Sequence, residues 1–204
     1  FAPMYWGKQP IVEAPAYLGA VLVFLFVLGI FLVKGKLKYW LVGVVVFSIL
    51  LSWGKNLNFL TNFFIDYVPM YNKFRAVSSI QVIAELAVPL LGILALNEFF
   101  NKTTAAEIKL NALKNSFFIT GGIALIFTLL GTSLFDFEGL RDASYDQLLP
   151  GLLENIIADR KAIFFSDSFR TLVFVTISAG ILWLFVKEKL NQNYALIILG
   201  AVIL

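Results

Sequence analysis

Long apolar runs separated by short polar segments dominate this chain. Five runs of 15 to 22 residues are predominantly apolar, and the first of them, residues 16–33, is apolar on all faces, which is typical of a helix surrounded by lipid or by other helices. Because about 20 apolar residues cross the hydrocarbon core of a bilayer, the pattern predicts an all-α, polytopic transmembrane helical bundle. We expect about five full spans and a truncated sixth: residues 16–33, 39–53, 79–100, 116–134, 171–186 and 194–204.

Two segments between these runs are amphipathic. In the first, four apolar side chains recur on one face at helical spacing: Leu60, Phe63, Phe64 and Tyr67. In the second, within residues 136–170, apolar pairs alternate with charged residues. Each pattern is typical of a helix lying in the plane of the membrane interface, so we expect two interfacial helices on the extracytoplasmic side.

Short motifs predict where two helices begin. Ser78 and Gln81 have the spacing of a capping box, and so do Thr104 and Glu107. A capping box uses two side chains to satisfy free backbone amides at a helix start. Residues 101–115 then form a polar link with at most a turn or two of helix.

Single residues refine the predicted spans. Pro89 should kink its helix, and Asp167 is suited to the N-cap of the run 171–186. Three glycines in the fourth run predict close packing against another helix: Gly121, Gly122 and Gly131.

The composition agrees with a membrane protein and excludes several functions. Apolar residues make up 60% of the chain and charged residues 14%, and the mean hydropathy is +0.87. A soluble fold of this size cannot bury so much apolar surface. The chain has no Cys or His, so it lacks disulfides, thiolate chemistry and the commonest metal ligand. No basic cluster has interleaved stacking residues, which excludes nucleic-acid binding.

The two ends of the chain predict that it is a section of a larger protein. The chain opens without Met, and its last apolar run is too short to cross a bilayer. We expect it to be a single section of a larger multi-span membrane domain, with the lipid bilayer and the remainder of the same polypeptide as its partners.

Basic residues predict the orientation. Eight lysines lie in three short loops (residues 34–38, 101–115 and 187–193), whereas eight other basic residues are spread over much longer segments. Basic residues in short loops mark the cytoplasmic side, so we expect these loops in the cytoplasm and the amphipathic segments outside.

Candidate chemistry gathers in residues 53–79, a polar and aromatic segment between two apolar runs. Its cations are Lys55, Lys73 and Arg75. They either bind an anionic headgroup or a lipid-linked phosphate, or they snorkel to the interface and pair with Asp66. Tyr71 suits sugar stacking or an aromatic belt. With a carboxylate in the next span, the candidate substrate-binding residues are Lys55, Tyr71, Asn72, Lys73, Arg75 and Glu85.

Acidic residues leave two alternatives open. Glu85, inside an apolar run, serves either a functional site or a structural hydrogen bond, for example with Gln81. The acidic run after the fourth span either holds a metal ion or is a solvated loop, and the second interpretation is favoured. This run comprises Asp136, Glu138, Asp142 and Asp146.

Four segments together resemble the YfhO-like family of bacterial membrane proteins, particularly as found in Bacteroidetes. They are YWGKQPIVEAPAYLGA (5–20), LLSWGKN (50–56), VPMYNKFRAVSS (68–79) and ADRKAIFFSDSFRTLVF (158–174). The Tyr-Asn-Lys-Phe-Arg element (71–75) resembles a loop that those proteins carry outside the membrane.

This resemblance implies a GT-C-type fold in the bacterial cytoplasmic membrane and glycosyl transfer from a polyprenyl-phosphate-linked sugar outside it. The catalytic carboxylate of that superfamily lies in an earlier loop, so the catalytic residue is unknown here and Arg75 is expected to contact the donor phosphate or headgroup. No cofactor is evident in this chain, and a divalent metal in the full protein is left open. The alternatives are a transporter or flippase of a lipid-linked or anionic substrate, and a purely structural membrane subunit.

Overall fold

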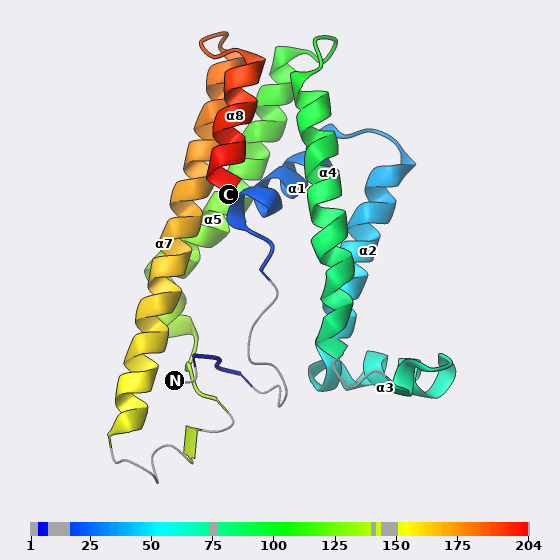
Figure 1. Cartoon of the computed structure of the whole chain (residues 1–204), viewed down its shortest axis with the longest axis vertical. Coiled ribbons are helices and arrows are strands. Elements are labelled where there is room, and N and C mark those ends of the chain that lie inside the picture. The colour runs from blue at the N-terminus through cyan, green and yellow to red at the C-terminus, as the bar shows by residue number, and fades with distance from the viewer. Residues whose placement is uncertain (1–3, 8–16, 74–76, 140–141, 144–150, 204) are drawn as a thin grey trace.

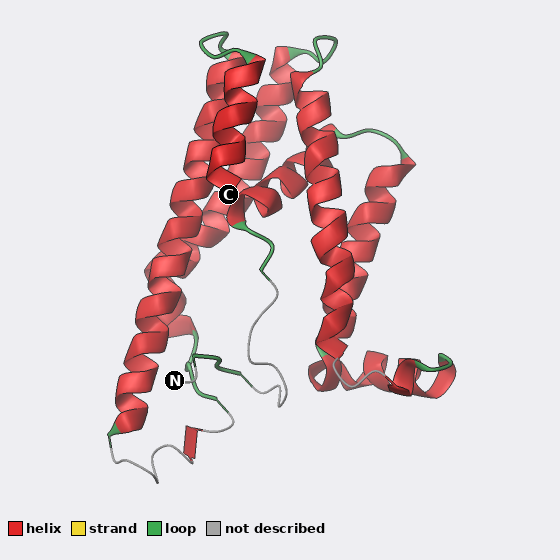
Figure 2. Cartoon of the chain, in the orientation of Figure 1, coloured by secondary structure: helices red, strands yellow, loops and turns green. Residues whose placement is uncertain are grey.

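The computed structural model describes residues 4–7, 17–73, 77–139, 142–143 and 151–203, and these residues are helical with short connections (Figures 1 and 2). The α-helices are α1 (Ala20–Leu32), α2 (Lys36–Ser52), α3 (Asn58–Tyr67), α4 (Val82–Phe100), α5 (Ala106–Leu134), α7 (Leu152–Val186) and α8 (Gln192–Ile203). Short 3-10 turns are η1 (Gly54–Leu57), η2 (Tyr71–Lys73) and η3 (Val77–Gln81). The predicted all-α class is confirmed for the described residues.

Three helices are long and apolar enough to cross a membrane: residues 78–100, 106–134 and 152–186. A fourth crossing arises only if α2 counts as one span with residues 54–67, which bend away from it by 105°. The expected five spans and truncated sixth are therefore not confirmed. The reason lies in α1 and α2, whose 13 and 17 residues span roughly 20 Å and roughly 25 Å, less than the hydrocarbon core of about 30 Å.

The fourth predicted span begins ten residues earlier than expected, so the predicted polar link is wrong. α5 runs for 29 residues from Ala106, and only residues 101–105 connect it to α4. Its first turns are rich in Ala, Glu, Lys and Leu, which favour helix, and they bury Lys109, Ala112 and Leu113. The predicted capping box is also absent, because Thr104 Oγ1 donates to Glu98 Oε1 at 2.6 Å.

The second predicted interfacial helix is not a separate element. Its described part is continuous with the fifth span as α7, a helix of 35 residues and roughly 50 Å. No proline interrupts residues 152–186, and the amphipathic half packs along α5. Asp167 consequently lies inside α7 rather than at an N-cap, and forms an ion pair with Arg170.

The core surrounds α1, which lies among α4, α5 and α7. Gly29 permits this packing, since a Cβ there would lie 2.7 Å from the Leu91 side chain and 2.9 Å from its carbonyl oxygen. Of the predicted contact glycines, only Gly131 meets a neighbouring helix, where a Cβ would overlap the Phe164 ring. α4 continues through Pro89 without a break.

The connections gather at two ends of the molecule. The links α4–α5 and α7–α8 lie at one end and the link α1–α2 lies toward it (Figure 1). α3 and residues 135–139, which follow α5, lie at the other end. The three lysine-rich segments are thus separated from α3 by the length of the bundle.

Candidate functional site

An apolar groove of about 820 Å³ lies between α1, α5 and α7, with residues 4–6 along one edge. Val23 and Val27 line it from α1, and Ile123 and Phe127 line it from α5. The volume falls within the roughly 300–1,000 Å³ of ordinary ligand pockets. Such a lining accepts a long apolar molecule more readily than a polar one.

Polar groups occur where α7 borders the groove. The polar lining residues on this wall are Arg160, Asp167, Ser168 and Thr171, and Thr120 lines the groove from α5. Arg160 lies toward the same end of the bundle as α3, because α7 begins at that end (Figure 1). The groove therefore combines an apolar wall with a polar strip.

Arg160 is buried and fully engaged by the segment that follows α5. Its Nη1 donates to Asp142 Oδ2 and to the Phe137 carbonyl, each at 2.8 Å, and its Nη2 donates to Asp142 Oδ1 at 3.0 Å. The Gly139 amide donates to Asp142 Oδ2 at 2.7 Å. This planar, two-pronged pairing fixes the segment against α7.

The charge of Asp142 follows from these contacts. Burial acts to raise the pKa of the Asp142 carboxyl, but the Arg160 hydrogen bonds, the Gly139 amide and the Arg160 charge outweigh burial and hold the pKa below its usual value. Asp142 is therefore neither a solvated loop residue nor a metal ligand. The described residues contain no group of three or more acidic side chains placed to hold a metal ion.

An aromatic cluster packs beside this ion pair. The Trp6 ring lies 4.7 Å from Phe137, 5.4 Å from Phe135 and 6.1 Å from Phe164, measured between centroids. The Gly7 amide also donates to the Glu138 carbonyl at 3.1 Å. Aromatic packing and the backbone bond together hold residues 4–7 at the groove edge.

Lys55 and Lys73, two of the three cations predicted from the sequence, are exposed. Lys55 lies in η1 and Lys73 ends η2, and neither forms an ion pair with Asp66 or with another described residue. Asn72 lies in η2 as well. Arg75 lies outside the described residues.

Glu85 lies in the first turn of α4 and is exposed. A carboxylate there is favoured by the positive end of the helix dipole. Gln81 does not form the predicted capping box; its Nε2 donates instead to Ser52 Oγ of α2 at 3.0 Å, which ties the two helices together.

Tyr71 is the predicted site residue with an unusual environment. Its hydroxyl oxygen is buried and has no hydrogen-bond partner in the described structure, and its ring lies 5.3 Å from Phe64. Burial raises the pKa of the Tyr71 hydroxyl, which therefore stays protonated at neutral pH.

Sequence reasoning missed Arg160 as an organising residue, although a signal was present. Ile156, Arg160, Phe164 and Ser168 recur every four residues and thus share one face of a helix. Ile156 and Arg160 are both 2% exposed, so this is the packed face of α7. An arginine on a packed face needs a buried acceptor, which Asp142 supplies.

The long apolar helices define a helical membrane protein. Comparisons with protein-family models, with curated proteins and with solved structures find no significant match. The likeness to the YfhO-like family therefore remains a prediction from the sequence motifs.

Proposed function

We propose that this chain is part of a membrane glycosyltransferase that uses a polyprenyl-phosphate-linked sugar on the extracytoplasmic face. In this proposal the chain contributes substrate-binding residues, and the catalytic carboxylate lies outside it. The observation that carries the proposal is the apolar groove between α1, α5 and α7 with its polar strip on α7. The assignment to sugar transfer comes from the resemblance of the sequence motifs to the YfhO-like family.

The groove suits the lipid part of such a donor. A polyprenyl chain is apolar and flexible, and gains by leaving water or disordered lipid for a preformed apolar wall. Arg160 is already neutralised by Asp142, so its role is to hold the wall in place rather than to bind phosphate. The donor phosphate is assigned to Lys55, Lys73 and Arg75, as the sequence predicts.

The same proposal fixes the orientation in a bacterial cytoplasmic membrane. The lysine-rich loops would face the cytoplasm, following the rule for short basic loops. α3 would lie in the outer interface, which is supported by its sharp bend from α2 and by its exposed rings. Phe59 is 80% exposed and Tyr67 is 74% exposed, as expected for rings that meet lipid and headgroups.

The test fills the groove in the full-length protein. Ile123→Trp adds bulk to the groove lining, and Leu130→Trp adds the same bulk to an exposed position of α5 that does not line it. Photo-crosslinking to a diazirine-labelled polyprenyl phosphate and sugar transfer should both fall roughly tenfold for Ile123→Trp. Neither should change for Leu130→Trp. Equal crosslinking by both variants would contradict the groove as the lipid site.

A second variant distinguishes binding of the donor phosphate from binding of its lipid tail. Arg75→Ala should lower sugar transfer while tail crosslinking to the groove persists. Unchanged transfer would remove Arg75 from the site.

A transporter or flippase is the second candidate, and α1 is the observation that favours it. α1 has only 13 residues, too few to cross the hydrocarbon core, and its N-cap Gly19, with a φ of 78°, lies beside the groove. Helices that end within the membrane line substrate sites in transporters. Movement of the labelled lipid between leaflets, without sugar transfer, would favour this function.

A further inference from the structure

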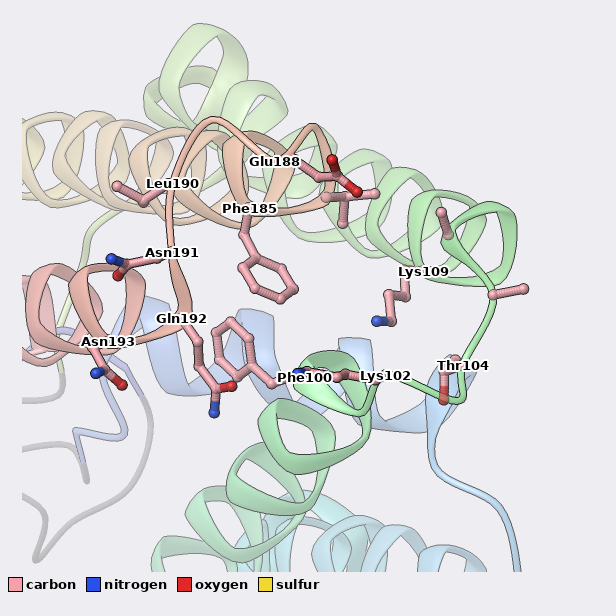
Figure 3. A pocket seen from close by; sticks show the side chains of 13 residues that line it. Phe100, Lys102, Thr104, Lys109, Phe185, Glu188, Leu190, Asn191, Gln192 and Asn193 are labelled. Carbon is pink, nitrogen blue, oxygen red and sulfur yellow. The ribbon is translucent and has the colours of Figure 1, made fainter.

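A second pocket, of about 740 Å³, lies at the end of the bundle opposite α3 (Figure 3). The ends of α4 and α7, their following loops, and the starts of α5 and α8 form it. Figure 3 shows Lys109 entering from α5 toward the rings of Phe185 and Phe100. Nothing in this pocket belongs to the groove described above, and its interpretation does not rest on the proposed function.

Lys109 is a buried cation with spare hydrogen-bonding capacity. It is 7% exposed, its Nζ donates to the Asn101 carbonyl at 2.8 Å, and Nζ lies 5.8 Å from the centroid of the Phe185 ring. An ammonium group has three donors. Two of them are therefore left without a described protein acceptor, on a side chain that lines the pocket.

The charge of Lys109 is also incompletely compensated. No carboxylate of a described residue lies within ion-pair distance of its Nζ. Glu98 acts on this charge from farther away, but its carboxylate accepts the hydrogen bond from Thr104. Since a buried charge without a close counter-ion is costly, the surroundings favour an added anion.

The starts of α5 and α8 add to the positive electrostatic potential of the pocket. At the start of α5 the residue before the helix is Ala105, which offers no side-chain cap, and the first intrahelical bond runs from the Lys109 amide to the Ala105 carbonyl at 3.2 Å. At the start of α8 the corresponding bond runs from Ala195 to Asn191 at 3.0 Å. The first residues of the two helices line the pocket: Ala106, Gln192 and Asn193. The positive ends of both helix dipoles therefore border it, although the Tyr194 amide of α8 is already capped by Asn191 Oδ1 at 3.0 Å.

We propose that this pocket binds a phosphate-bearing anion, with Lys109 as its central charge and Lys102 at the rim. A phosphate group carries several acceptor oxygens and is the usual ligand at helix starts. Glu188 is the single acid among the lining residues and is outnumbered by the two lysines. The rings of Phe100 and Phe185 accept apolar groups, so the headgroup of an anionic phospholipid and a soluble phosphate share the required chemistry.

The experiment measures ligand-dependent stabilisation of the full-length protein in neutral detergent. The probes are dioctanoyl phosphatidylglycerol, dioctanoyl phosphatidylcholine and inorganic phosphate. The anionic lipid should raise Tm, and Lys109→Met should weaken its apparent affinity at least about tenfold, as expected for a lost charge-assisted hydrogen bond. Lys114→Met, an exposed lysine further along α5, is the matched control and should change affinity by less than about twofold.

The probes distinguish the two sources of phosphate. Stabilisation by the anionic lipid alone identifies a headgroup site, and stabilisation by inorganic phosphate as well identifies a site for a soluble phosphate. Lack of stabilisation by either, or an equal loss in Lys114→Met, overturns the proposal. If Lys109→Met does not fold, Lys109→Arg should retain binding and Lys102→Met should weaken it several-fold. Unchanged binding by Lys102→Met and lost binding by Lys109→Arg would then overturn it.

Discussion

Two buried cations lie toward opposite ends of the α5–α7 pair, and their surroundings differ. Arg160 of α7 is 2% exposed and Lys109 of α5 is 7% exposed. Arg160 meets both carboxylate oxygens of Asp142 and a backbone carbonyl. Lys109 meets one backbone carbonyl. Burial is similar, but among the described residues only the arginine has a carboxylate within ion-pair distance.

The difference separates a structural contact from a candidate binding site. The planar guanidinium of Arg160 pairs with both oxygens of one carboxylate, and the pair is neutral. This end of the bundle therefore needs no added counter-ion. The ammonium of Lys109 is a compact charge beside an open pocket, so this end gains from an added anion. Removing a charge should therefore cost much more stability at the Arg160 end than at the Lys109 end.

Breaking the Arg160 pair should have the largest effect. Asp142→Ala leaves a buried guanidinium without its carboxylate, which should cost about 3–5 kcal/mol of unfolding free energy. Reversible unfolding in detergent measures this loss. Asp136→Ala is the control, because Asp136 is exposed and lies in the same segment.

Two further variants sharpen the comparison. The double variant Asp142→Leu with Arg160→Met removes both charges and should recover much of the loss, since neither charge is then left alone. Lys109→Met without ligand should change stability by less than about 1 kcal/mol, because a lost hydrogen bond is offset by the lost desolvation cost. Equal costs for Asp142→Ala and Lys109→Met would show that the two ends do not differ.

Acid should weaken the Arg160 end selectively. Because the pKa of Asp142 is lowered in the folded state, its contribution is fully present above the unfolded value of about 4 and is lost as the pH falls through the folded value. The hydrogen-exchange protection factors of residues 135–139, which compare each amide with its intrinsic rate at the same pH, should therefore fall at low pH in the wild type. In Asp142→Asn this dependence should disappear. Persistence in that variant would assign the acid response to another group.

Crowding the α5–α7 contact near Arg160 should have an intermediate effect. A Cβ at Gly131 would overlap the Phe164 ring, so Gly131→Ala should cost about 1–3 kcal/mol. Gly122→Ala is the control, since a Cβ there meets nothing within 4 Å and Ala favours helix. Thermal unfolding of both variants measures the difference, and similar Tm values would argue against a tight contact at Gly131.

The apolar runs predicted the helices well because helix formation in a membrane depends mainly on local composition. α2 and α4 lie close to the predicted residues 39–53 and 79–100. The predicted ends failed where a tertiary contact changed the role of a polar residue. Thr104 bonds to Glu98, and Gln81 bonds to Ser52, so neither acts as a cap.

The candidate sites depend on pairings that spacing cannot reveal. Arg160 and Asp142 are 18 residues apart, and the sequence gives no reason to choose this acid over Asp136. The sequence predicted Lys109 to be one of several lysines in an exposed loop. It is buried because α5 begins at Ala106, which places Lys109 inside a packed helix. The sequence therefore predicts the type of fold, and the packing decides which charges matter.

The smallest effect is expected for an ion pair that resembles Arg160–Asp142 in composition but not in burial. Asp167 and Arg170 lie one turn apart on α7, with Oδ1 and Nη2 2.9 Å apart and side chains 57% and 53% exposed. Asp167→Asn keeps the shape and removes the charge, and should cost less than about 1 kcal/mol because solvent and salt screen an exposed pair. Unfolding measured in 50 mM and 500 mM salt, roughly a threefold change in Debye length, should show a difference between wild type and variant that shrinks as salt rises. A cost near that of Asp142→Ala would mean that burial does not distinguish the two pairs.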